Sequence, residues 1–319
     1  MMTGIKNMKI FDMHADMGTN FYERHLKQEK DVFKTYHKDN LLKGNIKGIF
    51  TACFFCGTED WPYMQEMIIN CSKEIKANED ILRQIKTKED LIEDNKISAL
   101  ISVEGMCGIK DNVEEKIEWM YENGVRVASL VWNESNALAD GWKQDPNRGL
   151  SEDGIRVVHK MNELKMIIDV SHINEKGFWD IIKYSKKPII ATHSNSRSLC
   201  DHGRNLSDKQ LLAIKENGGL IGLNACGHFI DKDKNREDSY HLAKHAKYMA
   251  DLIGVEHIAC GFDYMDFLVG DYDDEMAIDM PNASYSQNLI KALKEVGFNE
   301  LEIRKIAYEN VFNFLKREL

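Results

Sequence analysis

The chain has 319 residues, of which 43% are hydrophobic, a share too high for a disordered protein. Its 42 Lys and Arg and 52 Asp and Glu give a net charge of −10, which argues against nucleic acid or an anionic membrane as the partner. The longest apolar stretch, residues 49–56, is too short to span a bilayer. Residues 1–9 lack the pattern of a secretion signal, so we expect a cytoplasmic protein without a membrane anchor.

The seven cysteines are an odd number and lie in apolar surroundings. Without a secretion signal, this usage is typical of reduced thiols in a protein core. Cys53 and Cys56 form a CxxC motif, but no second pair follows at the spacing of a zinc ribbon. We therefore expect both to be buried strand cysteines rather than a redox or metal site.

Short apolar runs alternate with longer segments along the whole chain. The runs, which we expect to be strands, are 9–13, 48–55, 97–103, 125–131, 166–170, 188–192, 220–224 and 257–262. Helix periodicity or end signals predict helices over 112–123, 151–165, 207–217, 240–253, 284–296 and 300–315. Ser207 and Gln210 have the spacing of a capping box, and Gly124, Gly254 and Gly297 follow predicted helix ends.

Strands that are apolar throughout are typical of parallel sheets with both faces covered. Eight such strands alternating with helices predict a (β/α)8 TIM-type barrel, formed as a single domain by residues 1–319. A doubly wound open sheet is the alternative. That fold usually has a glycine-rich loop after its first strand, whereas here the strand is followed by Asp12-Met13-His14-Ala15-Asp16.

Ligand-type residues end five of the eight predicted strands. They are His14, Asp16, Glu104, His172, His193 and Asp263. A barrel brings the C-terminal ends of its strands to one rim, so we expect these side chains to converge. Imidazole and carboxylate groups suit Zn²⁺, with Mn²⁺, Co²⁺ or Fe²⁺ as alternatives. Three His, one Asp and one Glu are too many for one catalytic ion, which favours a two-metal hydrolase.

Several short motifs follow one another along the chain. They are Asp12-Met13-His14-Ala15-Asp16, Glu104-Gly105, Gly124-Val125-Arg126, Asn136-Ala137-Leu138-Ala139-Asp140, Asp169-Val170-Ser171-His172, Thr192-His193-Ser194-Asn195 and Arg204-Asn205. In the order and spacing of these motifs, the sequence resembles the membrane dipeptidase (renal dipeptidase) family of metallopeptidases, within the amidohydrolase-like barrels. The family has serine at the position of Thr192.

The resemblance implies a role for each residue. His14 and Asp16 would hold one zinc ion, His172 and His193 the other, and Glu104 would bridge both. Water activated between the ions would be the nucleophile. Asp263 would take its proton and pass it to the leaving amine. Arg204 would bind the C-terminal carboxylate of a dipeptide.

Two positions depart from the family pattern. The family has a His after the fourth strand, thought to polarise the substrate carbonyl, and this chain has Trp132 there. An indole N–H can donate a hydrogen bond but cannot carry a positive charge, and its bulk reshapes a pocket. The family's Asp-Phe-Asp-Gly is Asp263-Tyr264-Met265-Asp266 here, so the second carboxylate is displaced by one position.

We therefore expect a dipeptidase with two Zn²⁺ ions per chain, acting on small dipeptides that include those with a C-terminal D-residue. A metal-dependent hydrolase of another small amide, such as an N-acyl or cyclic amino acid, is the first alternative. A metal-retaining binding protein with little turnover is the second.

The histidines on predicted helices or at their edges are expected to be exposed to solvent; they are His25, His37, His159, His241, His245 and His257. His241 and His245 share one helix face without a carboxylate motif, and we expect them to be structural. His202 and His228 lie in predicted rim loops, and their role stays open. The oligomeric state also stays open, with a homodimer as one option.

Overall fold

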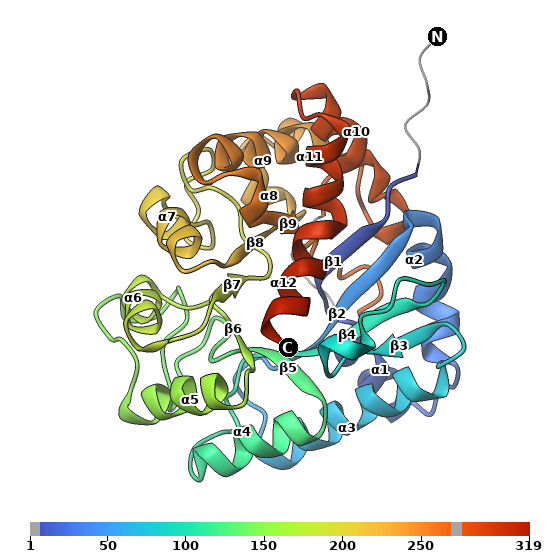
Figure 1. Cartoon of the computed structure of the whole chain (residues 1–319). Helices are drawn as coiled ribbons and strands as arrows, with labels where there is room; N and C mark the ends of the chain where they lie inside the picture. The colour runs from blue at the N-terminus through green and yellow to red at the C-terminus, as the bar shows by residue number, and fades with distance from the viewer. Residues whose placement is uncertain (1–6, 269–275) are drawn as a thin grey trace.

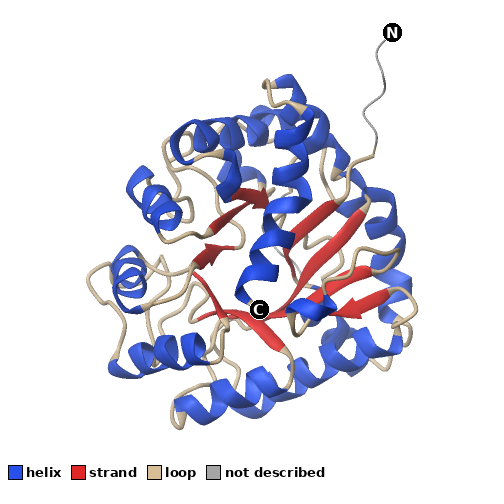
Figure 2. Cartoon of the chain, in the orientation of Figure 1, coloured by secondary structure: helices blue, strands red, loops and turns tan. Residues whose placement is uncertain are grey.

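The computed structural model describes residues 7–268 and 276–319. Its parallel strands form a closed barrel, with the helices outside it (Figure 2). The strands are β1 (Ile10–Ala15), β2 (Ile46–Phe54), β3 (Leu82–Gln84), β4 (Ile97–Glu104), β5 (Val125–Ser129), β6 (Ile167–Asp169), β7 (Ile189–Ala191), β8 (Leu220–Leu223) and β9 (Ile258–Cys260). Their order is β2-β1-β9-β8-β7-β6-β5-β4, and a further pairing of β2 with β4 closes the ring.

The eight strands of the ring are the eight that the sequence predicts. The short strand β3 was not predicted. It pairs with Ile97–Ala99 at the start of β4, on the edge that β5 occupies from Ile101 onward. Its sequence, Leu-Arg-Gln, has one buried residue and no apolar run, so no pattern signals it.

The helices occupy most of the connections between strands. They are α1 (Met17–Leu26), α2 (Lys38–Gly44), α3 (Trp61–Ala77), α4 (Val113–Glu122), α5 (Glu152–Glu163), α6 (Glu175–Tyr184), α7 (Asp208–Glu216), α8 (Gly227–Ile230), α9 (Ser239–Ile253), α10 (Gln287–Glu295), α11 (Glu300–Arg304) and α12 (Asn310–Glu318). The capping box of Ser207 and Gln210 is present at the start of α7. Gly124, Gly254 and Gly297 have φ angles of 98°, 92° and 102° after the ends of α4, α9 and α10.

The structure differs from the predicted helices in two respects. The predicted helix 300–315 is α11 and α12 joined by a π-helical segment, Lys305–Glu309. The helices α1, α2, α3, α6 and α8 were not predicted. In α3 the buried residues Met64, Met67, Ile68, Cys71 and Ile75 do recur at helical spacing, so that signal was available.

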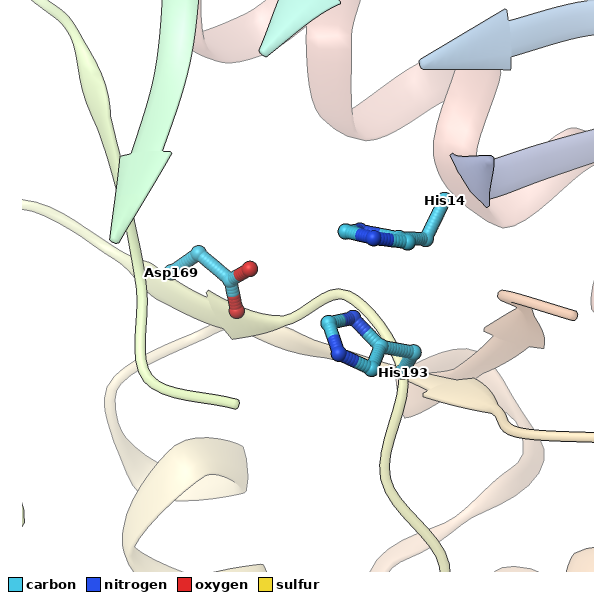
Figure 3. A group of neighbouring side chains, drawn as sticks. All are labelled: His14, Asp169 and His193. Atoms are coloured by element: carbon cyan, nitrogen blue, oxygen red, sulfur yellow. The ribbon is translucent and has the colours of Figure 1, made fainter. Parts of the chain in front are cut away.

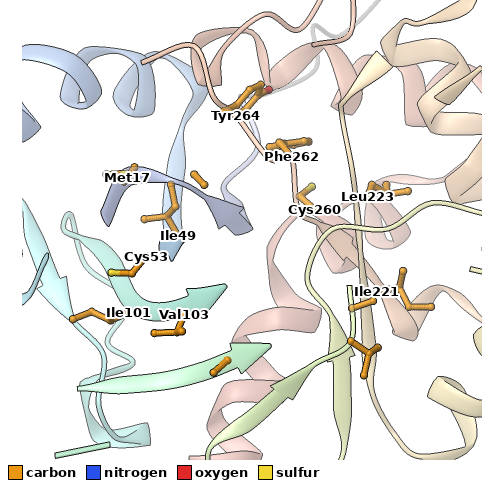
Figure 4. Packing of buried hydrophobic residues seen from close by; sticks show 14 of the residues in the cluster. Met17, Ile49, Cys53, Ile101, Val103, Ile221, Leu223, Cys260, Phe262 and Tyr264 are labelled. Carbon is orange, nitrogen blue, oxygen red and sulfur yellow. The ribbon is translucent and has the colours of Figure 1, made fainter. Parts of the chain in front are cut away.

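The end of the barrel opposite the strand C-termini is filled with apolar side chains. Phe11, Phe50 and Leu100 point into this inner cluster, and Phe312 and Leu315 of α12 cover it. Figure 1 shows α12 lying across this end of the barrel. A larger cluster fills the space between the barrel wall and the outer helices, with Ile49, Ile101 and Ile221 among its members (Figure 4). Neighbouring residues such as Ile49 and Phe50 thus belong to different clusters, as strand geometry requires.

All seven cysteines are free, and six are buried. Cys56 is exposed, so the expectation that both residues of the CxxC motif are buried is wrong for it. The reason is that β2 ends at Phe54, and Cys56 lies in the loop beyond. Among the described residues there is no helix of the length and hydropathy that a membrane crossing needs.

Candidate active site

The ligand-type residues named from the sequence meet at one rim of the barrel. His14 lies near the end of β1, Glu104 is the last residue of β4, and the others lie within three residues after the ends of β1, β6, β7 and β9. The five predicted metal ligands are each at most 5% exposed; they are His14, Asp16, Glu104, His172 and His193. The parallel arrangement of the strands brings them together, as the barrel hypothesis predicts.

These side chains form two groups that share Glu104. One group is His14, Asp16 and Glu104, and the other is Glu104, His172 and His193. Glu104 Oε2 lies 3.3 Å from His14 Nε2. Its Oε1 lies 2.5 Å from His172 Nε2 and 3.5 Å from His193 Nε2. The two carboxylate oxygens of Glu104 therefore face different groups.

Hydrogen bonds define how the imidazole of His172 is oriented. Its Nδ1 lies 3.0 Å from the side-chain oxygen of Asn133, which can only accept, so Nδ1 carries the hydrogen. Its Nε2 lies 3.0 Å from Arg204 Nη2. The Nε2 atoms of His172 and His193 lie 2.8 Å apart. The Nε2 atoms of both rings therefore face the same small region.

Burial dominates the electrostatics of the site. It raises the pKa of Glu104 to about 7 and the pKa of Asp263 to about 6. Burial, together with the charges of Arg204 and His14, lowers the pKa of His172 and of His193 well below the ordinary value. Burial also lowers the pKa of His14, but the carboxylates of Glu104 and Asp16 outweigh it and raise that pKa well above its usual range.

This donor set fits divalent metal ions. Neutral imidazoles and carboxylates are the protonation states that metal ligation requires. His14 Nε2 and Asp16 Oδ1 are buried and have no hydrogen-bond partner among the described residues. Such buried polar atoms are costly unless a ligand satisfies them. The residues of both groups could thus hold a metal ion each.

Asp263 lies beside the two groups in a strained position. Its φ angle of 64° is in the left-handed region, which side chains rarely adopt and which is often found at functional sites. Its Oδ1 lies 3.7 Å from His14 Nε2, and its Oδ2 accepts a hydrogen bond of 3.0 Å from Asn224 Nδ2. Asn224 follows β8, and the sequence analysis assigned it no function. A single asparagine after a strand gives no signal by itself.

A cavity of about 460 Å³ opens onto the metal ligands. Trp132 lines it, with its ring 5.0 Å from the ring of Phe54 and 6.2 Å from that of His172. Arg204 also lines it and is only 4% exposed. Its Nε and Nη1 have no hydrogen-bond partner among the residues that the structure describes. A buried guanidinium with free donors is suited to a planar anion.

His202 and His228, whose role the sequence left open, belong to the cavity wall next to Arg204. The ring of His202 lies 5.0 Å from that of Trp142 and 4.6 Å from that of Phe229. Burial and the nearby cations lower the pKa of His202 to about 4, so it is neutral at pH 7. This part of the wall is therefore aromatic, with Arg204 as its buried charge.

The other histidines lie away from the metal ligands. Those on predicted helices or at their edges were expected to be exposed to solvent, which is wrong for His37 and His245. His37 Nε2 lies 2.9 Å from Asn20 Oδ1, and His245 Nδ1 accepts from the backbone N–H of Ser196. His245 has the structural role that the sequence predicted. Both rings are buried because hydrogen bonds satisfy their nitrogens.

Comparison with known proteins relates this geometry to a family. A structure of a metallopeptidase from Rhodobacter sphaeroides, liganded with a phosphinate mimic of the dipeptide L-Ala-D-Ala, matches with a TM-score of 0.85 and 23% identity, over 98% of this chain and 99% of that chain. A structure of a dipeptidase of family M19 matches with the same TM-score and 24% identity, over the same shares of both chains. These likenesses support the barrel fold.

Sequence comparison goes further than the fold. An uncharacterized dipeptidase of Schizosaccharomyces pombe is 27% identical over 324 aligned positions, which cover 93% of this chain and 75% of the relative. The family model described as membrane dipeptidase (peptidase family M19) matches residues 4–318. The protein therefore belongs to the membrane dipeptidase family of metallopeptidases, and it is a peptide-bond hydrolase.

Proposed function

We propose that the protein is a dipeptidase that works with two Zn²⁺ ions per chain. The observation that carries this proposal is the position of Glu104, whose two oxygens face two separate groups of buried ligands. His14 and Asp16 would hold one ion, and His172 and His193 the other. Two bound ions supply Lewis-acid polarisation of the scissile carbonyl and ionise water near neutral pH.

Asp263 is the proposed proton carrier. Its Oδ1 is directed toward the metal ligands, while Asn224 holds Oδ2. A carboxylate in this position can take a proton from the attacking water and deliver it to the leaving amine. A protein that only binds its ligand has no need of such a group, so Asp263 weighs against the binding-protein alternative.

Arg204 is the proposed partner of the dipeptide's C-terminal carboxylate. Its side chain reaches the cavity beside His172, and two of its nitrogen atoms lack partners among the described residues. The relative from Rhodobacter sphaeroides carries a mimic of a dipeptide with a C-terminal D-residue. We extend this to the present chain and include L,D-dipeptides among the expected substrates.

Trp132 favours a second candidate function. It lies in the cavity with Phe54 and faces His172, where the family pattern has a His. The large apolar surface of an indole is suited to packing against a substrate group. A hydrolase of another small amide, with Trp132 contacting the acyl part, would use the same metal ligands. The cytoplasmic location, the homodimer and the single domain over residues 1–319 remain predictions.

The metal content tests the binuclear proposal. Protein loaded with zinc is expected to retain about two ions per chain, and a chelator should abolish activity. The Glu104→Gln substitution should weaken both sites together, because one carboxylate serves both. Elemental analysis of dialysed protein measures the ratio, with Glu66→Gln, an exposed glutamate of α3, as the matched control. A ratio of one or less in the native protein would contradict two-metal chemistry.

The Asp263→Asn substitution tests the proton carrier. We expect kcat to fall by about 10² to 10⁴, since amide cannot accept the proton, while the metal content stays near that of the native protein. Steady-state kinetics and elemental analysis measure the two quantities. Asp266→Asn, three residues along the same loop, is the control and should keep its activity. Loss of a metal ion from Asp263→Asn would instead identify Asp263 as a ligand.

The Arg204→Ala substitution tests recognition of the substrate carboxylate. Loss of a charge-assisted hydrogen-bonded pair should raise KM for free dipeptides on the order of 10- to 100-fold. Dipeptide amides, which lack the carboxylate, should already be poor substrates of the native enzyme. Arg197→Ala, a partly exposed arginine nearby, is the control. Equal turnover of a dipeptide and its amide would remove Arg204 from this role and favour the other-amide hydrolase.

The Trp132→His substitution distinguishes the two candidate functions. In a dipeptidase weakened by the missing imidazole, it should raise kcat on simple L,L-dipeptides and leave the metal content unchanged. Trp132→Phe, which keeps apolar bulk without an imidazole, should give no such gain. The readout is kcat on a panel of L,L- and L,D-dipeptides. A uniform loss for Trp132→His would show that the indole itself contacts the true substrate.

A further inference from the structure

A third group of ligand-type side chains is formed by Asp169 together with two of the proposed metal ligands, His14 and His193 (Figure 3). Asp169 is not free to bind a metal, because its oxygens already accept hydrogen bonds. Oδ1 accepts from the backbone N–H groups of Ser171 and Thr192 at 3.0 Å each, and from Ser171 Oγ at 2.6 Å. Oδ2 accepts from Thr192 Oγ1 at 2.5 Å. A third metal site therefore does not explain why these three side chains lie together.

The hydroxyl of Thr192 lies between Asp169 and both histidines. It has one proton, which goes to Asp169 Oδ2, so its lone pairs face the imidazoles. His193 Nδ1 lies 2.7 Å from Thr192 Oγ1, and His14 Nδ1 lies 3.4 Å from it. Both Nδ1 atoms must then carry hydrogen and donate. In the neutral rings that metal ligation requires, this leaves the Nε2 lone pair of each ring directed at Glu104.

Two glycines of the neighbouring strands lie directly beside the backbone carbonyl of Thr192. A Cβ atom added to Gly222 would lie 1.9 Å from Thr192 O, and one added to Gly261 would lie 1.8 Å from it. Both glycines thus allow β8 and the end of β9 to approach Thr192 closely. The Thr192 hydroxyl, which contacts both imidazoles, is therefore on a segment with little freedom to shift.

We propose that Thr192 is a positioning residue shared by the two metal sites, an inference that rests on the binuclear proposal above. His14 belongs to one ligand group and His193 to the other, yet one hydroxyl orients both rings. Asp169 in turn fixes the direction of that hydroxyl. A metal ligand held by such a contact typically loses about 10- to 100-fold in metal affinity when the contact is removed. Here a single change should weaken both sites.

The test compares zinc affinity in Thr192→Val, Thr192→Ser and Thr51→Val, with each apoprotein titrated against a chromophoric chelator. Valine keeps the shape of threonine and removes the hydroxyl, whereas serine keeps the hydroxyl. Thr51 is a second fully buried threonine of the barrel, and its Oγ1 is hydrogen-bonded to Leu100 O and Cys71 Sγ instead of to a histidine. Its substitution measures the effect of losing a buried hydroxyl on the fold alone.

We expect Thr192→Val to lose about 10- to 100-fold in affinity at both sites, while Thr192→Ser and Thr51→Val stay near the native values. The visible spectrum of the Co²⁺-loaded protein should change only in Thr192→Val. Native affinity in Thr192→Val, or weakening of one site alone, would overturn the shared role. If the native protein itself binds one ion, the binuclear proposal fails, and the affinity of Thr192→Val for that ion then decides whether Thr192 positions its histidine.

Discussion

The site depends on the cost of burying carboxylates and imidazoles together. Glu104 and Asp16 are buried at the barrel rim, and the Asp263 side chain is 14% exposed. Loss of contact with water raises the pKa of Glu104 and of Asp263. Buried charges are stable only when partners compensate them. Here the histidines turn their Nε2 atoms toward Glu104, and Asn133, Thr192 and Asn224 satisfy the far side of the ligand groups. Positive charge at the centre of the site would compensate these buried carboxylates.

One end of the barrel contributes stability, and the other end carries the candidate active site. At one end the side chains of α12 seal an apolar interior, which contributes stability through burial. At the other end the strand termini present polar groups, and the backbone of Asp263 adopts a strained conformation. Strain of this kind persists only when the surrounding structure enforces it. The close packing of the apolar end of the barrel therefore allows the strained backbone of Asp263 to persist at the rim.

Two parts of the cavity wall differ in chemistry, and this difference affects which substrate group each part can contact. Beside Arg204 the wall is aromatic and includes Trp142, His202 and Phe229. On the other side Phe54 and Trp132 form an apolar face. The shared fold and the metal ligands do not determine which group this face contacts, because function resides in a site built on a common fold. The side chains of the loops decide it.

The sequence by itself determined the barrel and indicated the candidate ligand residues. Apolar runs of strand length mark β1, β2 and β4 to β9, and His14, Glu104 and His172 stand at strand ends, where parallel strands place side chains on one rim. These features are local and periodic, so they can be recognised in the sequence alone. Sequence patterns do not reveal the strand β3, the exposure of Cys56 or the burial of His37, because these depend on where neighbouring segments end and pack.

Only the tertiary structure decided how the ligands are oriented. Asn133 and Asn224 each act on the site through one hydrogen bond to a side chain distant in sequence, and Thr192 Oγ1 contacts a histidine 178 residues away. Such contacts leave no periodic pattern, because one polar residue after a strand looks like any other turn residue. The sequence specifies which groups reach the rim. Closure of the ring through the pairing of β2 with β4 brings these groups within hydrogen-bonding distance, and that pairing is a property of the folded chain alone.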